Sequence, residues 1–361
     1  MINEDTHYYN MDLIRYVLAI SVLINHFNIL AGTDFYWPIA SHIAVGIFFG
    51  LSGFLVYTSY LKRPVFHKYL KSRIKRIFPP YLFIVLICAL GFVFLSTLSA
   101  IEYFSSSTFW KYLGANLIFL NFLQPELPGV FTNLPISAVN GSLWTLKVEW
   151  MLYLSIPIFV WLIRRFKLNT TYTIIAIIIL SVIYRIFFEY LFKQSGNEIY
   201  HILSYQFSGQ MMYFFAGVLF YHLLPTIKKH LLLVFLSSIA VYTLCYIVNM
   251  FINSNIILDF ISYLLVPASL VSFALVISIY RPLGKWVKHL NNFSYEIYLF
   301  HFPIIQVLLT SLPLKGVGGS PVLLLILSIL ITIIISYAFS KVHNMLKNSR
   351  KPVEKYVENF S

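Results

Sequence analysis

Charged residues are scarce in this sequence. Only 11% of its 361 residues are Asp, Glu, Lys or Arg, whereas an average soluble domain has about 25%. Hydrophobic residues make up 59% and aromatic residues 18%, and the mean hydropathy is +0.79. Because so few polar side chains cannot cover a water-soluble globule, the composition excludes ordinary soluble domains and predicts a polytopic membrane protein.

Cysteine is also scarce. The chain has only Cys88 and Cys245, and both lie inside apolar runs. Two such residues support neither a disulfide framework nor a zinc site of the Cys-x-x-Cys kind, so we predict no metal site. The start of the chain, Met1–His7, is slightly acidic and precedes a long apolar stretch without a small-residue cleavage site. We therefore predict insertion as a signal anchor and no removable signal peptide.

Apolar stretches of about 20 residues, the length that spans a bilayer, recur along the chain. We place ten of them, at about 11–31, 39–60, 78–98, 143–163, 172–192, 199–224, 231–252, 256–280, 291–312 and 320–341. The predicted fold class is therefore all-α, with about ten transmembrane helices. Residues 1–345 would form the membrane-embedded domain, and 346–361 a cytoplasmic C-terminal tail.

Basic residues are distributed unevenly between the predicted loops. If the N-terminus is cytoplasmic, twenty fall in inner segments and three (Lys111, Lys193 and Lys315) in outer ones. The inner ones are Lys62, Arg63, Lys68, Lys71, Arg73, Lys75, Arg76, Arg164, Arg165, Lys167, Lys228, Lys229, Arg281, Lys285, Lys288, Lys341, Lys347, Arg350, Lys351 and Lys355. This positive-inside bias predicts that both termini are cytoplasmic. It also accounts for most of the net charge of +13, so no nucleic-acid partner is needed to explain it.

The connection at 99–142 is longer than the other loops and lies outside in this topology. It contains two apolar pieces, Phe109–Leu123 and Gly129–Val139, that are too short to span and too apolar for a free loop. We predict a re-entrant or interfacial segment there.

Ionisable side chains at membrane depth are candidates for function. Arg15 and His26 are 11 residues apart, which on a helix is three turns plus about 20°, so both lie on one face about 16 Å apart along the axis. The simpler alternative is that Arg15 reaches to the cytoplasmic interface and His26 hydrogen-bonds a neighbouring helix. Arg185 and Glu189, four residues apart on the fifth span, are predicted to pair structurally.

Glu149 lies at the same predicted depth as His26, about two turns into the fourth span from its outer end. A carboxylate that orients an imidazole and stabilises its protonated form supports a general base acting on an alcohol. The alternative is that Glu149 pairs locally with Lys147 or with another cation that the sequence does not identify. A lone buried histidine such as His301 is by default a packed, hydrogen-bonding residue.

Arg73 and Arg76 project from one side of a helical turn on the cytoplasmic side, where two guanidiniums can clamp a phosphate. The alternative is an anchor for anionic lipid. Small residues around Ser52, in Phe48–Leu55, predict a close approach by a helix or a thin ligand.

Together these strings resemble the acyltransferase 3 family of integral membrane acyltransferases. The resemblance is carried, in family order, by Arg15 with His26, Phe49-x-x-Ser-Gly-Phe-Leu55, Arg73-x-x-Arg76 with Pro79 and Tyr81, Leu143-Trp-Thr-Leu-Lys-Val-Glu149 with Tyr153, and Ser294-Tyr295 to His301. It implies that His26 is the base, with Glu149 in the catalytic region, and that the acyl-CoA phosphates lie near Arg15, Arg73 and Arg76. Ser52, Trp144, Tyr153 and His301 would line the substrate site. Lys147 and Trp150 depart from the family's usual residues beside Glu149.

The resulting prediction is an O-acyltransferase that moves an acyl group, which we expect to be acetyl, from acyl-CoA to a sugar hydroxyl of a cell-surface polysaccharide or its lipid-linked precursor. Acetyl-CoA would be a substrate rather than a resident cofactor, and the partners would be acyl-CoA, a saccharide acceptor and membrane lipid. An acyl-His26 intermediate is an alternative to direct transfer. A transporter or flippase of lipid-linked sugars, or a non-enzymatic assembly partner, is the rival function.

Overall fold

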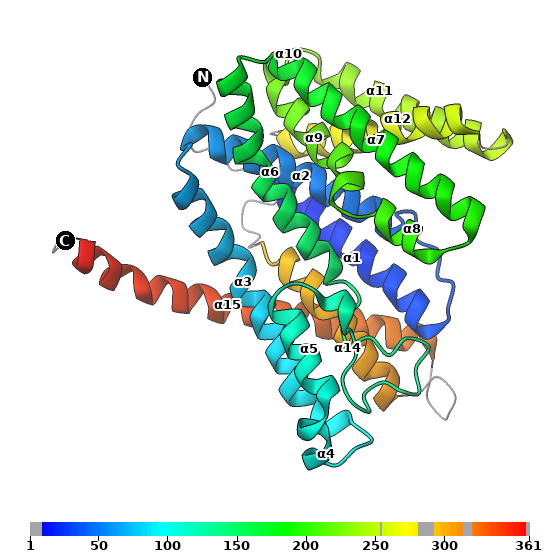
Figure 1. The fold of residues 1–361 in the computed structure, drawn as a ribbon, viewed down its shortest axis with the longest axis vertical. Coiled ribbons are helices and arrows are strands. Elements are labelled where there is room, and N and C mark those ends of the chain that lie inside the picture. The colour runs from blue at the N-terminus through cyan, green and yellow to red at the C-terminus, as the bar shows by residue number, and fades with distance from the viewer. Residues whose placement is uncertain (1–8, 253–254, 281–291, 313–319, 359–361) are drawn as a thin grey trace. The chain divides into compact units, whose positions relative to one another are not determined.

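The computed structural model describes residues 9–252, 255–280, 292–312 and 320–358, and these form helices joined by turns and loops, without a strand (Figure 1). The helices are α1 (Tyr9–Ala31), α2 (Ser41–Lys62), α3 (Phe66–Gly91), η1 (Phe92–Leu95), α4 (Ala100–Ser105), α5 (Ser107–Leu117), η2 (Asn121–Leu123), α6 (Trp144–Phe166), α7 (Thr170–Ser195), α8 (Glu198–Ser204), α9 (Phe207–His222), α10 (Leu224–Ile227), α11 (Leu231–Phe251), α12 (Ile256–Ile279), α14 (Ser294–Ser311) and α15 (Pro321–Glu358). Met1–His7, Arg281, Lys285, Lys288 and Lys315 lie outside the described residues.

Eight helices within the described residues are long and apolar enough to cross a membrane, namely α1, α2, α3 with η1, α6, α7, α11, α12 and α15. They correspond to eight of the ten predicted spans. Many of their large hydrophobic side chains are exposed, such as Leu233 of α11 at 66%. Exposed apolar surface on this scale is expected where a helix faces lipid, so the chain is a multi-pass membrane protein.

The other two predicted spans take different forms. The stretch 199–224 is divided between α8, α9 and α10, and α9 itself has only 16 residues. The stretch 291–312 contains α14, whose 18 residues include the polar side chains Glu296, His301 and Gln306. Their helical character was predicted correctly, but neither has the length and composition of an ordinary span.

Two predicted boundaries differ from the helices. The third span was placed at 78–98, whereas α3 begins at Phe66 and continues through Pro79 and Pro80. Arg73 and Arg76 therefore lie on a helix, as their spacing required. At the other end of the chain, α15 runs from Pro321 to Glu358 and so continues past residue 345, where the division between membrane domain and tail stays a prediction.

The chain divides into two compact units. Unit 1 comprises Met1–Leu18, His42–Arg76 and Thr145–Leu290, and unit 2 comprises Ala19–Ser41, Ile77–Trp144 and Asn291–Ser361. In unit 1, α12 packs against α7, α9 and α11, and α7 packs against α9. In unit 2, α14 packs against α15, and an apolar core that includes Phe27, Phe302 and Leu324 joins the C-terminal part of α1 to both (Figure 1).

The long connection at 99–142 belongs to unit 2. Its helix α4 begins with a capping box in which Ser99 and Glu102 bond each other's backbone, and these hydrogen bonds lower the pKa of Glu102. The Phe109–Leu123 piece contains most of α5, whereas Gly129–Val139 forms turns and loop. The Gln306 amide of α14 donates to the carbonyls of Ile136 (2.7 Å) and Ala138 (3.0 Å), which fastens the loop to that helix.

The small residues of α2 permit close contact with α9, as predicted from Phe48–Leu55. A Cβ added at Gly53 would lie 2.0 Å from the Phe214 carbonyl oxygen, and one at Gly217 would lie 1.9 Å from the Gly50 carbonyl oxygen. Both obstacles are backbone atoms, which a rotamer change cannot move. The two helix backbones are therefore in contact, the arrangement that small residues allow in membranes.

Gly53→Ala is consequently expected to lower stability by about 1–3 kcal/mol, the usual range for overpacking. Gly114→Ala is the matched control, since Gly114 is also helical but has nothing within 4 Å of the added Cβ, and it should be neutral or slightly stabilising. Thermal unfolding of the detergent-purified variants measures both. Equal melting temperatures for the two variants would contradict the backbone contact.

Candidate functional site

The two candidate histidines of unit 2 lie side by side although 275 residues separate them in the chain. His26 Nδ1, on α1, is 2.7 Å from His301 Nε2, on α14, and the ring planes are within 1° of parallel. His301 is fully buried and His26 is half-buried. His301 is therefore the direct partner of His26, beyond the lining role predicted for it.

The remaining contacts of His301 determine which nitrogens carry hydrogen in the neutral pair. Its Nδ1 lies 3.2 Å from the Ile297 carbonyl oxygen, which can only accept a hydrogen bond. A neutral His301 thus carries its hydrogen on Nδ1 and accepts at Nε2, so His26 donates from Nδ1. The lone pair of His26 is then on Nε2, to which no described residue of unit 2 hydrogen-bonds. That is the form a general base requires.

A proline in α14 explains a second contact near this pair. Pro303 has no N–H to give to the Leu299 carbonyl one turn earlier. The Asn140 side-chain amide donates to that carbonyl instead, at 2.9 Å. The neighbouring Ser142 and Tyr298 exchange hydrogen bonds between side chain and backbone at 3.4 and 3.2 Å. The segment before α6 is thereby attached to the turn of α14 that carries His301. Trp144, half-buried, follows directly as the first residue of α6.

Six predicted site residues come together in unit 1. Arg15 on α1 is 8% exposed and interacts electrostatically with Arg76 of α3 and with Glu149 and Tyr153 of α6. The Tyr153 hydroxyl donates to Glu149 and is also hydrogen-bonded to Ser52 of α2. Once Arg73 is included, this group contains three guanidiniums and one carboxylate, and the buried Asp12 carboxylate of α1 also interacts with Arg15. The group is a cationic cluster suited to an anionic ligand.

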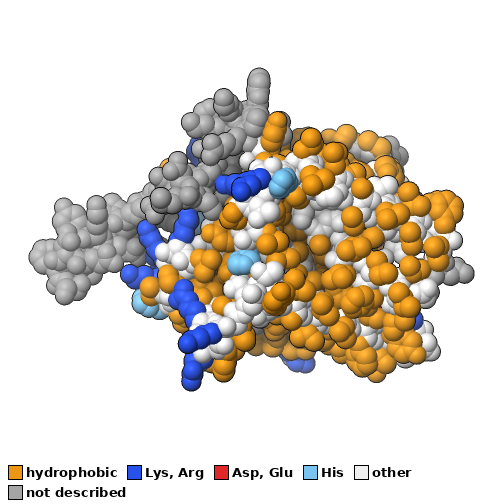
Figure 2. Space-filling view, turned by 90° about the horizontal axis from the view of Figure 1, so that it is seen from above, with side chains coloured by type: hydrophobic (Ala, Val, Ile, Leu, Met, Phe, Trp, Pro, Cys, Tyr) orange, Lys and Arg blue, Asp and Glu red, His pale blue; other side chains and the backbone are white. Residues whose placement is uncertain are grey.

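Arg73 joins the group through aromatic rings. Its guanidinium carbon lies 5.6 Å from the Tyr69 ring centroid and 5.8 Å from that of Tyr153, both within cation–π range. The Tyr69 hydroxyl donates to the Tyr153 carbonyl at 2.8 Å, and this carbonyl is free because Pro157, one turn later, has no N–H. Lys and Arg side chains gather in one part of the face in Figure 2, and hydrophobic ones cover most of the rest.

The site residues that sequence reasoning missed are the supporting ones. Asn140 and Tyr298 support His301, and Tyr69 supports Tyr153. A signal was available, because a proline inside a predicted helix frees the carbonyl four residues earlier, which then needs another donor. Each site has such a proline.

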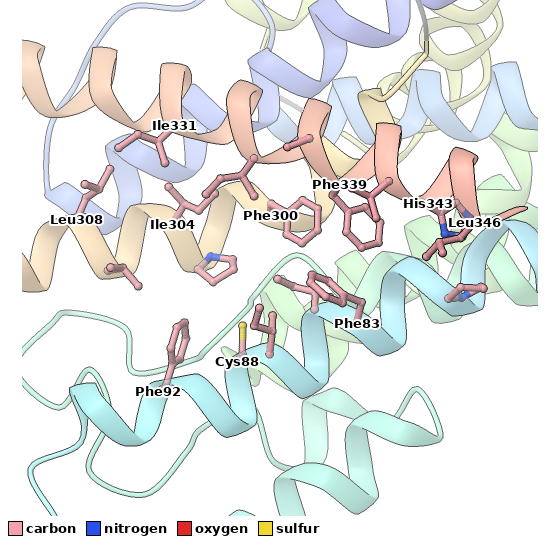
Figure 3. Close-up of a pocket in the computed structure, with 18 residues that line it drawn as sticks. Phe83, Cys88, Phe92, Phe300, Ile304, Leu308, Ile331, Phe339, His343 and Leu346 are labelled. Carbon is pink, nitrogen blue, oxygen red and sulfur yellow. The ribbon is translucent and has the colours of Figure 1, made fainter.

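An apolar groove of about 860 Å³ in unit 2 runs between α3, α14 and α15. Figure 3 shows phenylalanines from all three sides, namely Phe83, Phe300 and Phe339, with Cys88 and His343 as the polar exceptions among the labelled residues. The lining is almost wholly apolar, which does not suit the charged head of a CoA thioester, and we place the candidate site at the histidine pair and the cationic cluster instead.

Three comparisons bear on identity. The family model described as an acyltransferase domain matches residues 8–341. An O-acetyl transferase of Shigella phage Sf6 is 26% identical over 309 residues, which cover 83% of this chain and 86% of the relative. Nodulation protein 10 of Rhizobium leguminosarum bv. viciae is 28% identical over 173 residues, or 45% and 46% of the two chains. No solved structure matches the chain significantly. Because the model covers nearly the whole chain, this membrane protein belongs to the acyltransferase 3 family.

Proposed function

We propose that the protein transfers an acetyl group from acetyl-CoA to a sugar hydroxyl of a cell-surface polysaccharide or its lipid-linked precursor, in a bacterial inner membrane. The observation that carries the proposal is the hydrogen bond from His26 to His301, which directs the lone pair of His26 to Nε2. Family membership and the similarity to the phage O-acetyl transferase support the type of reaction.

In the proposed reaction, His26 Nε2 removes the proton of the acceptor hydroxyl as its oxygen attacks the thioester carbonyl. The new oxygen–carbon bond forms, the carbon–sulfur bond breaks, and the CoA thiolate takes the proton back from the imidazolium. In the alternative, His26 Nε2 attacks the thioester carbonyl first, so that a nitrogen–carbon bond forms as the carbon–sulfur bond breaks; the acceptor oxygen then displaces the imidazole from the acyl carbon, and the hydroxyl proton goes to the CoA thiolate. Throughout the reaction, the hydrogen bond to His301 Nε2 keeps a hydrogen on His26 Nδ1. The orienting role predicted for Glu149 stays a prediction, since its described contact is Tyr153.

The donor would bind through the cationic cluster of unit 1. CoA carries several phosphate charges, and guanidiniums bind phosphate in paired, charge-assisted hydrogen bonds. Arg15 and His26 lie on one helix, so an axial rise of about 16 Å separates them. A charged head held at the arginines and an acyl group carried on a slender arm toward the histidine would suit this spacing. The acceptor would approach from the outer side.

Turnover of radiolabelled acetyl-CoA by the purified protein is the deciding experiment. An acetyltransferase releases CoA and forms a labelled acetyl ester when an acceptor glycan is supplied. Transport of a lipid-linked sugar without consumption of acetyl-CoA would instead favour the flippase, and neither activity would favour an assembly partner.

Replacing Arg73 and Arg76 together by Ala is expected to weaken acetyl-CoA binding by roughly 10²-fold or more, because charge-assisted hydrogen bonds contribute about 1.5–3 kcal/mol each. Lys at both positions should restore little, since a point charge lacks the guanidinium fork. Lys75→Ala, an exposed neighbour on the same helix, is the matched control. Unchanged affinity in the double variant, measured by calorimetry, would assign this pair to lipid anchoring.

The proposed orientation can be tested by cysteine labelling in intact cells. Ser105 is exposed on the outer connection and, unlike Ser106, does not cap a helix. Both native cysteines are buried, so they should contribute little background. We expect Cys at 105 to react with an impermeant maleimide in intact cells, and Cys at the exposed Lys68 to react only after permeabilisation. The reverse pattern would overturn the topology.

A further inference from the structure

Arg185, on α7 in unit 1, is a buried cation without a hydrogen bond. The residue is only 5% exposed, and its Nε has no hydrogen-bond partner. The nearest carboxylate oxygen, Glu189 Oε1, is 3.5 Å from Nε, which gives an ion pair of poor hydrogen-bond geometry. No described residue of unit 1 accepts a hydrogen bond from this guanidinium. The pairing predicted from the sequence is therefore present but leaves the donors unused.

Two tyrosine rings lie against the cation, and the His42 side chain of α2 interacts with it electrostatically. The guanidinium carbon lies 3.7 Å from the Tyr205 ring centroid and 5.4 Å from that of Tyr263. Contact with a ring face stabilises the positive charge. It does not satisfy the N–H groups, which point outward in the guanidinium plane in a fixed fork. The fork is thus available to a ligand that brings two oxygen acceptors.

The Glu189 carboxylate that pairs with Arg185 is also engaged by α8. Its Oε1 accepts from the Ser204 hydroxyl at 2.6 Å and lies 3.4 Å from His201 Nδ1. Those two partners come from α8, so the carboxylate serves to fasten α8 to α7. Gly209 at the start of α9 permits the same fastening, because a Cβ there would lie 1.9 Å from the Ser204 carbonyl oxygen.

The surroundings are accessible and sugar-compatible. The His201 side chain is 40% exposed, and Tyr205 and Tyr263 are half-buried, so a ligand can approach from this side. These residues come from α8, the turn that follows it and the first turns of α12, at ends predicted to be outer. Amphipathic rings with polar hydroxyls beside a fixed cation are typical of sites that orient a polar ligand by a few groups.

We propose that Arg185 binds a carboxylate or phosphate carried by the saccharide acceptor, whose ring packs against Tyr205 and Tyr263. The inference rests on the proposed function in one respect only, that the acceptor is a saccharide. The paired oxygens of either anion match the guanidinium fork. Arg185 would then select acidic or phosphorylated sugars and hold them at the outer entrance, apart from the proton transfer assigned to His26.

Binding of three monosaccharide probes to the full chain in phosphatidylcholine nanodiscs tests this without requiring turnover. The probes are methyl glucuronide, glucose 1-phosphate and the neutral methyl glucoside. At low ionic strength we expect the two anionic sugars to bind at least 10-fold more tightly than the neutral one, and Arg185→Gln to abolish the difference. Equal binding of all three probes would overturn the proposal.

Glu189→Gln separates a ligand site from a structural ion pair, even where Arg185→Gln fails to fold. Gln keeps an oxygen for the Ser204 hydroxyl but removes the competing charge, so affinity for the anionic probes should rise about 3–10-fold. Glu198→Gln makes the same charge change at an exposed position of α8 and should raise it by less than 2-fold. Equal effects of the two variants, or none, would contradict the site.

Two further arms complete the test. In the first, the melting temperature is compared between phosphatidylglycerol and phosphatidylcholine nanodiscs. A higher melting temperature in phosphatidylglycerol that depends on Arg185, without discrimination among the sugars, would assign the cation to a lipid headgroup and overturn the proposal. Acetyl transfer that proceeds normally while anionic sugars gain no preference would also overturn it. Selective binding of anionic sugars in a protein that never consumes acetyl-CoA would support the site while removing the proposed function.

Discussion

His26→Gln is expected to reduce acetyl transfer by about 10²–10⁴-fold, the usual range for loss of a positioned base. Gln keeps much of the volume and can still hydrogen-bond to His301 Nε2 in place of His26 Nδ1. It cannot take a proton at neutral pH, so packing is preserved while proton transfer is lost. Acetyl-CoA binding and the melting temperature should stay near wild type, because the cationic cluster belongs to unit 1.

His222→Gln is the matched control for this variant, since His222 is exposed in the last turn of α9. Initial rates at saturating acetyl-CoA, together with calorimetric binding of CoA, measure both variants. A wild-type rate for His26→Gln would make His26 a packing residue and leave His301 as the next candidate base.

His301→Leu is expected to lower kcat by about 10²-fold while leaving the KM for acetyl-CoA unchanged. Leu removes the acceptor that holds the hydrogen on His26 Nδ1, so both tautomers of His26 become populated. A wrong tautomer in a Ser-His-Asp enzyme lowers the rate by roughly 10⁴-fold. We expect a smaller effect here because the neutral His301 orients His26 but adds no negative charge.

His301→Gln distinguishes positioning from packing. The Gln carbonyl oxygen can accept from His26 Nδ1, so the rate should return to within about 10-fold of wild type, with the same apparent pKa in the pH–rate profile. Equal rates in the Leu and Gln variants would contradict positioning. If both were low, His301 itself would have to exchange a proton, and if both were near wild type it would be packing only.

The spans and the local spacing of site residues were predictable because they depend on neighbours in the chain. Hydropathy located eight helices that the structure confirms, and the spacing of Arg73 and Arg76 correctly implied a helix. Hydropathy missed the start of α3, because its first turns are too polar to count as part of a span but are still helical. At α14 the polar side chains have partners within the protein, which an average of hydropathy hides; Gln306, for example, donates to the Ile136 carbonyl.

The partners of the site residues were not predictable, because they come from distant segments. The shared predicted depth in the membrane suggested that Glu149 orients the His26 imidazole. Depth alone, however, cannot tell which helix lies next to α1. His301, on α14, holds the Nδ1 position that an orienting carboxylate would occupy. In the same way the spacing of Arg185 and Glu189 predicted an ion pair, whereas the two tyrosine rings on Arg185 come from elements some 20 or more residues further on.

The two prolines at the candidate sites have a consequence for how this sequence can vary. Pro303 and Asn140 are complementary, as are Pro157 and Tyr69, because each proline frees a carbonyl that the distant side chain satisfies. Loss of the side chain alone strands a buried acceptor, whereas loss of the proline alone makes two donors compete for one carbonyl. The two members of each pair are therefore expected to covary among related sequences. A substitution at one position should favour a compensating substitution at the other.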